Sequence, residues 1–194
     1  MSNASSMRRL GVVLFAALAA MLALSASASA ERSLFFEETA EAFWAVPHEC
    51  ADGSIVQGTL LVRSTRDFEA PDTEDADPTA RVQFLAVCPG GTSFSWAAPT
   101  APATITSEEN LKSVHAAGSG IARDNLSGAH QVSFDVTWTG VGPIETTVNT
   151  AGSKRKQREA TATGQVTFDG DVLVDGEANH PTRPPPFIRV DTEK

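Results

Sequence analysis

The chain has 194 residues, with 24 Asp or Glu against 15 Lys or Arg, so its formal charge is −9 at neutral pH. A surface of this sign repels phosphate backbones and anionic membranes, which argues against nucleic acid as a partner. The one basic cluster, Lys154–Arg158, is short, and we interpret it as a solvent-exposed loop.

The N-terminus has the three parts of a bacterial-type secretory signal. Arg8-Arg9 supplies positive charge, an apolar run follows over Leu10–Leu24, and small residues end at Ala28-Ser29-Ala30. The apolar run is shorter than the roughly 20 residues that a spanning helix needs. We therefore predict cleavage between Ala30 and Glu31, with release of the mature chain to a secreted, periplasmic or extracellular location.

The predicted mature chain, residues 31–194, has the length of a single domain and no later stretch apolar enough to span a membrane. Removing residues 1–30 takes away two arginines and no acid, so 13 basic and 24 acidic residues give a charge of −11. Both cysteines, Cys50 and Cys88, lie in this domain. An even cysteine count outside the cytoplasm predicts one disulfide.

The mature chain opens with a stretch that differs from the rest. Leu34–Phe43 is rich in alanine and glutamate, so we expect a short N-terminal helix there, with an edge strand as the alternative. After it, apolar and polar residues alternate with the period of half-buried strands. The clearest case is Gln131–Thr139, which places Trp138 on the buried face. The same period recurs over Ser54–Ser64, Arg81–Cys88, Ile144–Val148, Ala160–Phe168, Asp171–Glu177 and Phe187–Val190.

Seven to nine short antiparallel strands predict an all-β fold. We favour a β-sandwich, with an up-and-down β-barrel as the alternative. If Ser54–Ser64 and Arg81–Cys88 pair as a hairpin, Cys50 and Cys88 close its open end. The sequence between them, Thr65–Ala80, then forms a long acidic loop.

That acidic loop is a weak candidate for calcium, whose preferred ligands are oxygens. The carboxylates that could contribute are Asp72, Glu74, Asp75 and Asp77. The spacing of an EF-hand is missing, because no glycine follows the acids and no glutamate closes the loop. We therefore predict no metal and no cofactor.

A search for catalytic motifs finds none. There is no G-x-S-x-G sequence, and the four histidines, His48, His115, His130 and His180, lack the spacing of a zinc site. The carboxylates around Asp169-Gly170 are explained by a tight turn, which favours both residue types. We therefore expect a protein that is not an enzyme.

Three functions remain open at this point. The leading prediction is an exported, non-catalytic β domain that binds a partner or serves a structural role through its loops. The second is a barrel that carries a small apolar ligand. In size, strand content and single disulfide the chain resembles lipocalin-like proteins, but Ala42-Phe43 precedes Trp44 where that family has Gly-x-Trp, so no family residues are assigned. The third is a hydrolytic enzyme with a spatially assembled site.

Overall fold

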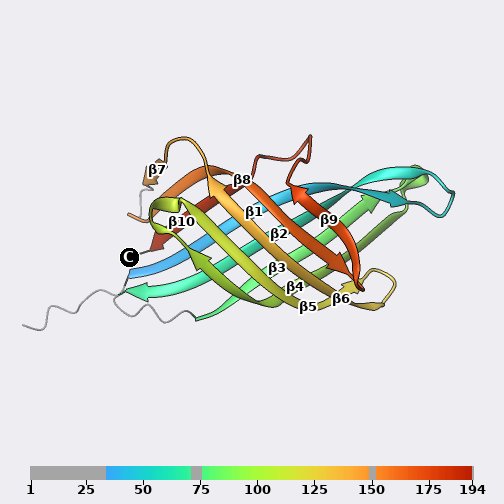
Figure 1. The fold of residues 1–194 in the computed structure, drawn as a ribbon, viewed down its shortest axis with the longest axis horizontal. Helices are drawn as coiled ribbons and strands as arrows, with labels where there is room; N and C mark the ends of the chain where they lie inside the picture. Colours follow the sequence, from blue (N-terminus) through green and yellow to red (C-terminus); the bar gives the residue numbers. More distant parts are fainter. Residues whose placement is uncertain (1–33, 71–75, 149–151, 194) are drawn as a thin grey trace, which may run out of the picture. The chain divides into compact units, whose positions relative to one another are not determined.

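The computed structural model describes residues 34–70, 76–148 and 152–193, and most of them lie in antiparallel β-strands (Figure 1). In chain order the strands are β1 (Leu34–Glu49), β2 (Ile55–Ala70), β3 (Ala76–Val87), β4 (Ser93–Ser107), β5 (Ser113–Asp124), β6 (Ala129–Gly140), β7 (Glu145–Val148), β8 (Lys154–Phe168), β9 (Asp171–Glu177) and β10 (Phe187–Glu193). Two single-turn 3-10 helices, η1 (Pro89–Gly91) and η2 (Glu109–Leu111), lie in turns. The predicted all-β antiparallel class is confirmed.

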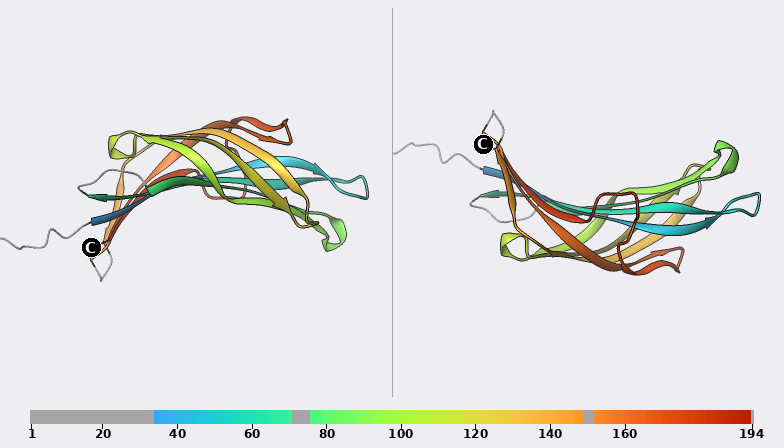
Figure 2. Two further views of the ribbon diagram at one scale, coloured as in Figure 1. Left: turned by 90° about the horizontal axis from the view of Figure 1, so that it is seen from below. Right: turned by 90° about the horizontal axis from the view of Figure 1, so that it is seen from above.

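The strands close into a barrel. Each strand from β1 to β5 pairs with the next, β6 pairs with β8, β8 pairs with β10, and β10 pairs back with β1. Among the described residues, strands β7 and β9 pair with β8 alone, and they lie outside this circuit. Figure 2 shows the curvature of the sheet from two sides. Of the two architectures that the sequence left open, the structure therefore has the barrel and not the sandwich.

Alternate residues of the strands fill the barrel interior. Trp138, Leu60 and Ile188 are all 0% exposed, and Phe84 and Trp96 are 4% and 3% exposed. A cavity wide enough for water would leave accessible surface on the side chains that line it. The interior around these residues is therefore packed with side chains, as protein cores are.

The expectation of a helix at Leu34–Phe43 is wrong. This segment is the first part of β1, and its residues pair with β2 in one continuous register from Leu34 opposite Ala70 to Glu49 opposite Ile55. Ala40 and Ala42 are fully buried while Glu41 between them is not, which is the period of a strand. Helix propensity is a weak preference, and the long-range pairing outweighs it here.

The interpretation of Lys154–Arg158 as a loop is also wrong, because these residues begin β8 and pair with both β10 and β7. Arg155 Nε donates to Asp191 Oδ1 at 2.7 Å across the β8–β10 pair. The predicted long loop at Thr65–Ala80 is shorter than expected, because β2 extends to Ala70 and β3 begins at Ala76.

Several sequence predictions fall outside the described residues. They include the signal segment with its cleavage site at Ala30 and Glu31, and the calcium candidates Asp72, Glu74 and Asp75. Asp77 lies within β3.

Candidate functional site at the disulfide end of the barrel

Four turns gather at one end of the barrel, on the right of Figure 1. They join β1 to β2, β3 to β4, β5 to β6 and β8 to β9. We call them the rim, defined as Cys50–Ser54, Cys88–Thr92, Asp124–Gly128 and Asp169-Gly170. Three side-chain links connect these turns in order.

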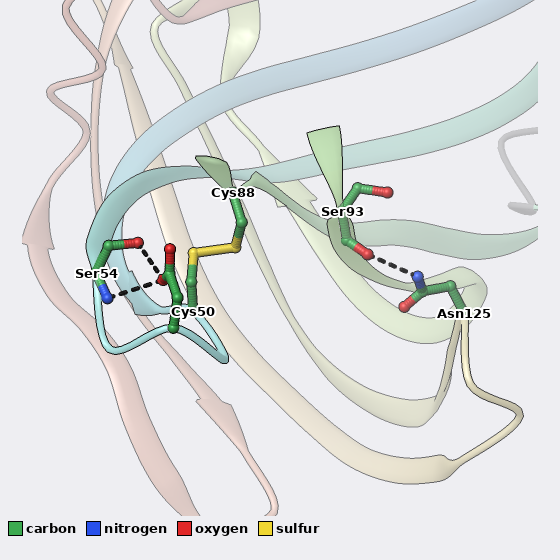
Figure 3. Close-up of a disulfide and its surroundings, with 6 residues drawn as sticks. Cys50, Ser54, Cys88, Ser93 and Asn125 are labelled. Atoms are coloured by element: carbon green, nitrogen blue, oxygen red, sulfur yellow. Dashed lines mark hydrogen bonds between the residues drawn. A yellow bond between two sulfur atoms is a disulfide. The ribbon is translucent and has the colours of Figure 1, made fainter. Parts of the chain in front are cut away.

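The first link is the disulfide between Cys50 and Cys88, whose Cα atoms are 5.9 Å apart (Figure 3). It confirms the predicted bond and joins the β1–β2 turn to the β3–β4 turn. The Cys50 N–H donates to the Ser54 carbonyl, and the Cys88 N–H donates to the Thr92 carbonyl, both at 2.8 Å. Each cysteine therefore starts its own closed turn, and the disulfide holds two small, ordered loops together.

Asp52 orders the first of these turns. Its Oδ1 accepts hydrogen bonds from the Ser54 hydroxyl at 2.6 Å and from the Ser54 N–H at 3.0 Å. These bonds favour the ionised carboxylate and lower the pKa of Asp52. The turn thus presents a fixed negative charge to solvent.

The second link is Asn125, which connects the β5–β6 turn to the start of β4 (Figure 3). Its Nδ2 donates to the Ser93 carbonyl at 2.9 Å, and its Oδ1 accepts from the Ser95 N–H at 3.2 Å. The Asn125 N–H also donates to the Ser95 carbonyl at 2.9 Å. The hydrogen bonds of Asn125 therefore continue the contact between β5 and β4 at the point where their strand pairing ends.

The third link is His130, which lies between the carboxylates of Asp124 and Asp169. Its Nδ1 is 2.7 Å from Asp169 Oδ2, and its Nε2 is 3.1 Å from Asp124 Oδ2. The bond to Asp169 and then the bond to Asp124 raise the pKa of His130, while the His130 ring lowers the pKa of each aspartate. Because ionised carboxylates only accept, the protonated ring can donate to both of them, one bond from each nitrogen. This ion triad joins the β5–β6 turn to the β8–β9 turn.

The same two aspartates also hold turn backbone. Asp124 Oδ1 accepts from the N–H groups of Leu126 at 2.9 Å and Gly128 at 2.6 Å. Asp169 Oδ1 accepts from the Gln131 N–H at 2.9 Å. The triad is therefore anchored to the main chain on both sides.

A row of rings crosses the barrel beneath the rim. Neighbouring rings lie with centroids between 4.5 and 6.2 Å apart, distances typical of favourable aromatic contacts. The row consists of His48 from β1, Phe84 from β3, Phe94 and Trp96 from β4, Phe168 from β8 and His130 from β6. Phe84 and Trp96 are buried, and the other four rings are partly exposed. The row closes the packed interior at this end.

Aliphatic side chains stand out into solvent around the rim. Leu126 is 77% exposed at the tip of the β5–β6 turn, and Ile55 is 74% exposed at the start of β2. Val87 and Val172 are also exposed, at 59% and 56%. Apolar side chains gathered at one end of a domain, among polar neighbours, are typical of an interaction surface.

The remaining sequence candidates lie apart from one another. His115 pairs with Asp135 at 2.9 Å on the outer face of the sheet, and His180 contacts the Thr59 hydroxyl at 2.9 Å. No group of three or more His, Cys, Asp or Glu side chains in the described part of the chain is arranged to hold a metal ion. Sequence reasoning missed the His130 triad because 39 residues separate His130 from Asp169, and no spacing rule connects them.

At the opposite end, a surface pocket of about 220 Å³ lies beside β7 and β8 and is lined by Val141, Gly142, Pro143, Glu145, Gln157 and Glu159. Arg158 lies near it and donates from Nε to the Gly142 carbonyl at 3.0 Å. The pocket has two carboxylates and no described ring or cation among its lining residues, so the rim offers the richer set of contacts.

Within the described ranges, no helix is long and apolar enough to cross a membrane. Comparison of the chain with protein-family models, with curated proteins and with solved structures found no match.

Proposed function

We propose that this protein is an exported, non-catalytic binding protein that recognises a partner at its rim. The observation that carries the proposal is the linkage of four turns, in order, by a disulfide, by Asn125 and by the His130 triad. Binding residues commonly lie on loops that a rigid scaffold positions. Loops already held in one conformation lose little entropy when a partner binds, which favours affinity.

The chemistry of the rim supports binding better than catalysis. A general base needs a ring nitrogen that is free to take a proton from a substrate. In the His130 triad both ring nitrogens lie within hydrogen-bond distance of a carboxylate, so the ring links two turns and neither nitrogen is free for a substrate. The export part of the proposal is supported by the disulfide and by the signal-like N-terminal sequence.

The second candidate is a carrier of a small apolar ligand, which the barrel architecture accommodates. The partly exposed rings of His48, Phe94 and Phe168 could stack against a flat apolar molecule at the rim. We rank this function lower because the interior is occupied by large buried side chains such as Trp138 and Phe134. A ligand inside the barrel would have to displace them.

A binding selection tests the proposal. A random peptide library displayed on phage is selected against the oxidised mature protein, and each selected peptide is titrated against three variants. Leu126→Asp changes the rim, and Ile55→Asp changes the residue directly after its first turn. Val148→Asp introduces the same residue on β7 at the opposite end, where Val148 is 63% exposed. All three should fold, because each residue is exposed.

We expect the Leu126→Asp and Ile55→Asp variants to bind the selected peptides about tenfold more weakly or worse, because the new carboxylate would lose water where an apolar side chain contacts the peptide. The Val148→Asp variant should bind like the wild type. Equal affinity for all variants would contradict recognition at the rim. A parallel thermal-shift screen with fatty acids and isoprenoids tests the carrier function. If the protein is a carrier, we expect such a ligand to raise the Tm of the wild type and of the Leu126→Asp and Ile55→Asp variants alike.

A further inference from the structure

The links around the rim leave one side open. They run from the β1–β2 turn through the β3–β4 and β5–β6 turns to the β8–β9 turn. Within the described residues, no disulfide, hydrogen bond or ion pair joins the β8–β9 turn back to the β1–β2 turn. The open side therefore lies between β9 and the second half of β1.

Both strands that border the open side have a free edge. Strand β10 pairs with β1 only over Phe35–Glu41, so the described chain places no strand beside Ala42–Glu49 on the side away from β2. Strand β9 pairs with β8 over Thr163–Phe168 and has no second partner in the described ranges. Residues two apart in a strand direct their main-chain groups to the same edge. In β8, the Ala160 N–H donates to the Pro186 carbonyl, and the Ala162 carbonyl accepts from the Ala178 N–H. Strands β10 and β9 therefore lie along the same edge of β8. The free edge of β9 therefore faces the free edge of β1.

One side-chain hydrogen bond joins β1 to β9. The Trp44 indole N–H donates to the Gly176 carbonyl at 3.2 Å. The Trp44 side chain therefore links β1 to β9 at Gly176, which the register places opposite Gly164 of β8. Between Trp44 and the rim, no described hydrogen bond joins Ala45–Glu49 to Asp171–Asp175.

The two free edges differ in what they offer. Pro47 lies in β1 near the rim, and proline has no N–H to give to a neighbouring strand. Strand β9 contains no proline over Asp171–Glu177, so each of its residues has an N–H. Unpaired strand edges are templates for a further strand, and pairing of this kind is a common mode of peptide recognition. The edge of β9 is the better template.

The charges around the open side indicate which kind of peptide segment would bind there. Glu49 at the end of β1 is exposed, as are Asp171, Asp175 and Glu177 on β9. Arg183 lies over the Phe43 ring, with its Cζ 5.7 Å from the ring centroid. Exposed Val172 adds an apolar contact beside the carboxylates. An incoming segment with alternating basic and apolar side chains complements this border.

We propose that the open side of the rim binds an extended, cationic segment of a partner protein, which adds to the barrel as a strand along β9. The inference rests on the proposed function, because it names the chemistry of the partner that the rim recognises. The backbone of β9 provides the affinity, and the surrounding carboxylates select lysine and arginine.

A synthetic peptide tests strand addition directly. Lysine and valine alternate over about seven residues, which matches the extended length of β9. Two further peptides carry N-methyl groups on the backbone, one at the lysines and one at the valines, so that each loses the N–H donors along one edge only. A fourth peptide has glutamate in place of lysine. Affinities are measured by titration calorimetry, and amide hydrogen exchange is followed across β9.

We expect the unmodified peptide to bind and to slow exchange of the amides from Val172 to Asp175. One methylated peptide should bind about tenfold more weakly, because only one edge of an added strand faces β9. The other should bind like the parent, and the glutamate peptide should not bind. Equal behaviour of the two methylated peptides, or the absence of parent binding, would overturn strand addition.

Substitutions in the protein complete the test. Asp171→Lys and Asp175→Lys together should weaken binding of the cationic peptide about tenfold. Glu145→Lys together with Glu159→Lys makes the same change of charge at exposed positions of the opposite end and should not. Equal weakening by the control would also overturn the inference. If the cationic peptide does not bind while Leu126→Asp still weakens the binding of library-selected peptides, strand addition is wrong and the proposed function stands. If Leu126→Asp has no effect on any selected ligand, the proposed function itself fails.

Discussion

Removing the disulfide should reveal how strongly it stabilises the barrel. In the variant Cys50→Ala with Cys88→Ala, the cross-link is lost without leaving a free thiol. The two cysteines are 38 positions apart, and the loop-closure model for a loop of that length gives about 4 kcal/mol of stabilisation at 25 °C. The bond acts mainly by restricting the unfolded chain, and the native turns at Cys50 and Cys88 retain their own hydrogen bonds. The folded barrel should therefore survive.

For a domain of this size, a loss of about 4 kcal/mol corresponds to a fall in Tm of roughly 8–16 °C. Urea unfolding of the oxidised wild type, the reduced wild type and the double variant measures the effect, with tryptophan fluorescence as the signal. The reduced wild type is the matched control and should behave like the variant. A loss below about 1 kcal/mol in both would refute the view that the bond constrains a long loop of the unfolded chain.

Substitutions at three further positions address the rim and the barrel wall. His130→Gln should flatten the pH dependence of stability. The pKa of His130 is raised in the folded protein, so its stabilising contribution is complete below about pH 6.5 and is lost as the pH rises through the folded pKa. The pKa values of Asp124 and Asp169 are lowered, so their contribution is lost as the pH falls below about 4. Urea unfolding of both proteins at pH 5.5 and 8.5 measures this, and identical pH dependence would contradict the triad. Asn125→Ala should lower the unfolding free energy by about 1–2 kcal/mol, with Asn125→Asp in between because it keeps one acceptor; equal stability of all three by the same assay would show that the link is weak. Gly164→Ala should cost about 1–3 kcal/mol in thermal unfolding, because its Cβ would lie 2.4 Å from the Asp135 carbonyl oxygen, and an unchanged Tm would show that the β6–β8 pair can spread.

The alternation of apolar and polar residues predicted most strands, because it depends only on which face of each strand is buried. Gln131–Thr139 shows one buried and one exposed face in the structure as it does in the sequence, and Trp138 is buried as predicted. The hairpin closed by Cys50 and Cys88 was predictable for the same reason, since its strands are neighbours in the chain.

Closure of the sheet could not be predicted in this way. Sandwich and barrel share the same strand pattern, and what separates them is the pairing of β10 with both β8 and β1, which joins the two ends of the domain. The His130 triad was missed for a related reason. Asp169 was explained by its tight turn alone, and the turn is present, but the second role of the carboxylate depends on a partner brought close by folding.

The positions of the three tryptophans make the molecule its own spectroscopic probe. The chain has no tyrosine, so its intrinsic emission comes from Trp44, Trp96 and Trp138 alone. Trp96 reports on the ring row beneath the rim, and Trp44 reports on the open side through its bond to Gly176. Trp138 is fully buried, and its indole N–H has no hydrogen-bond partner among the described groups. Single-tryptophan variants would therefore read three levels of the barrel separately without any attached dye.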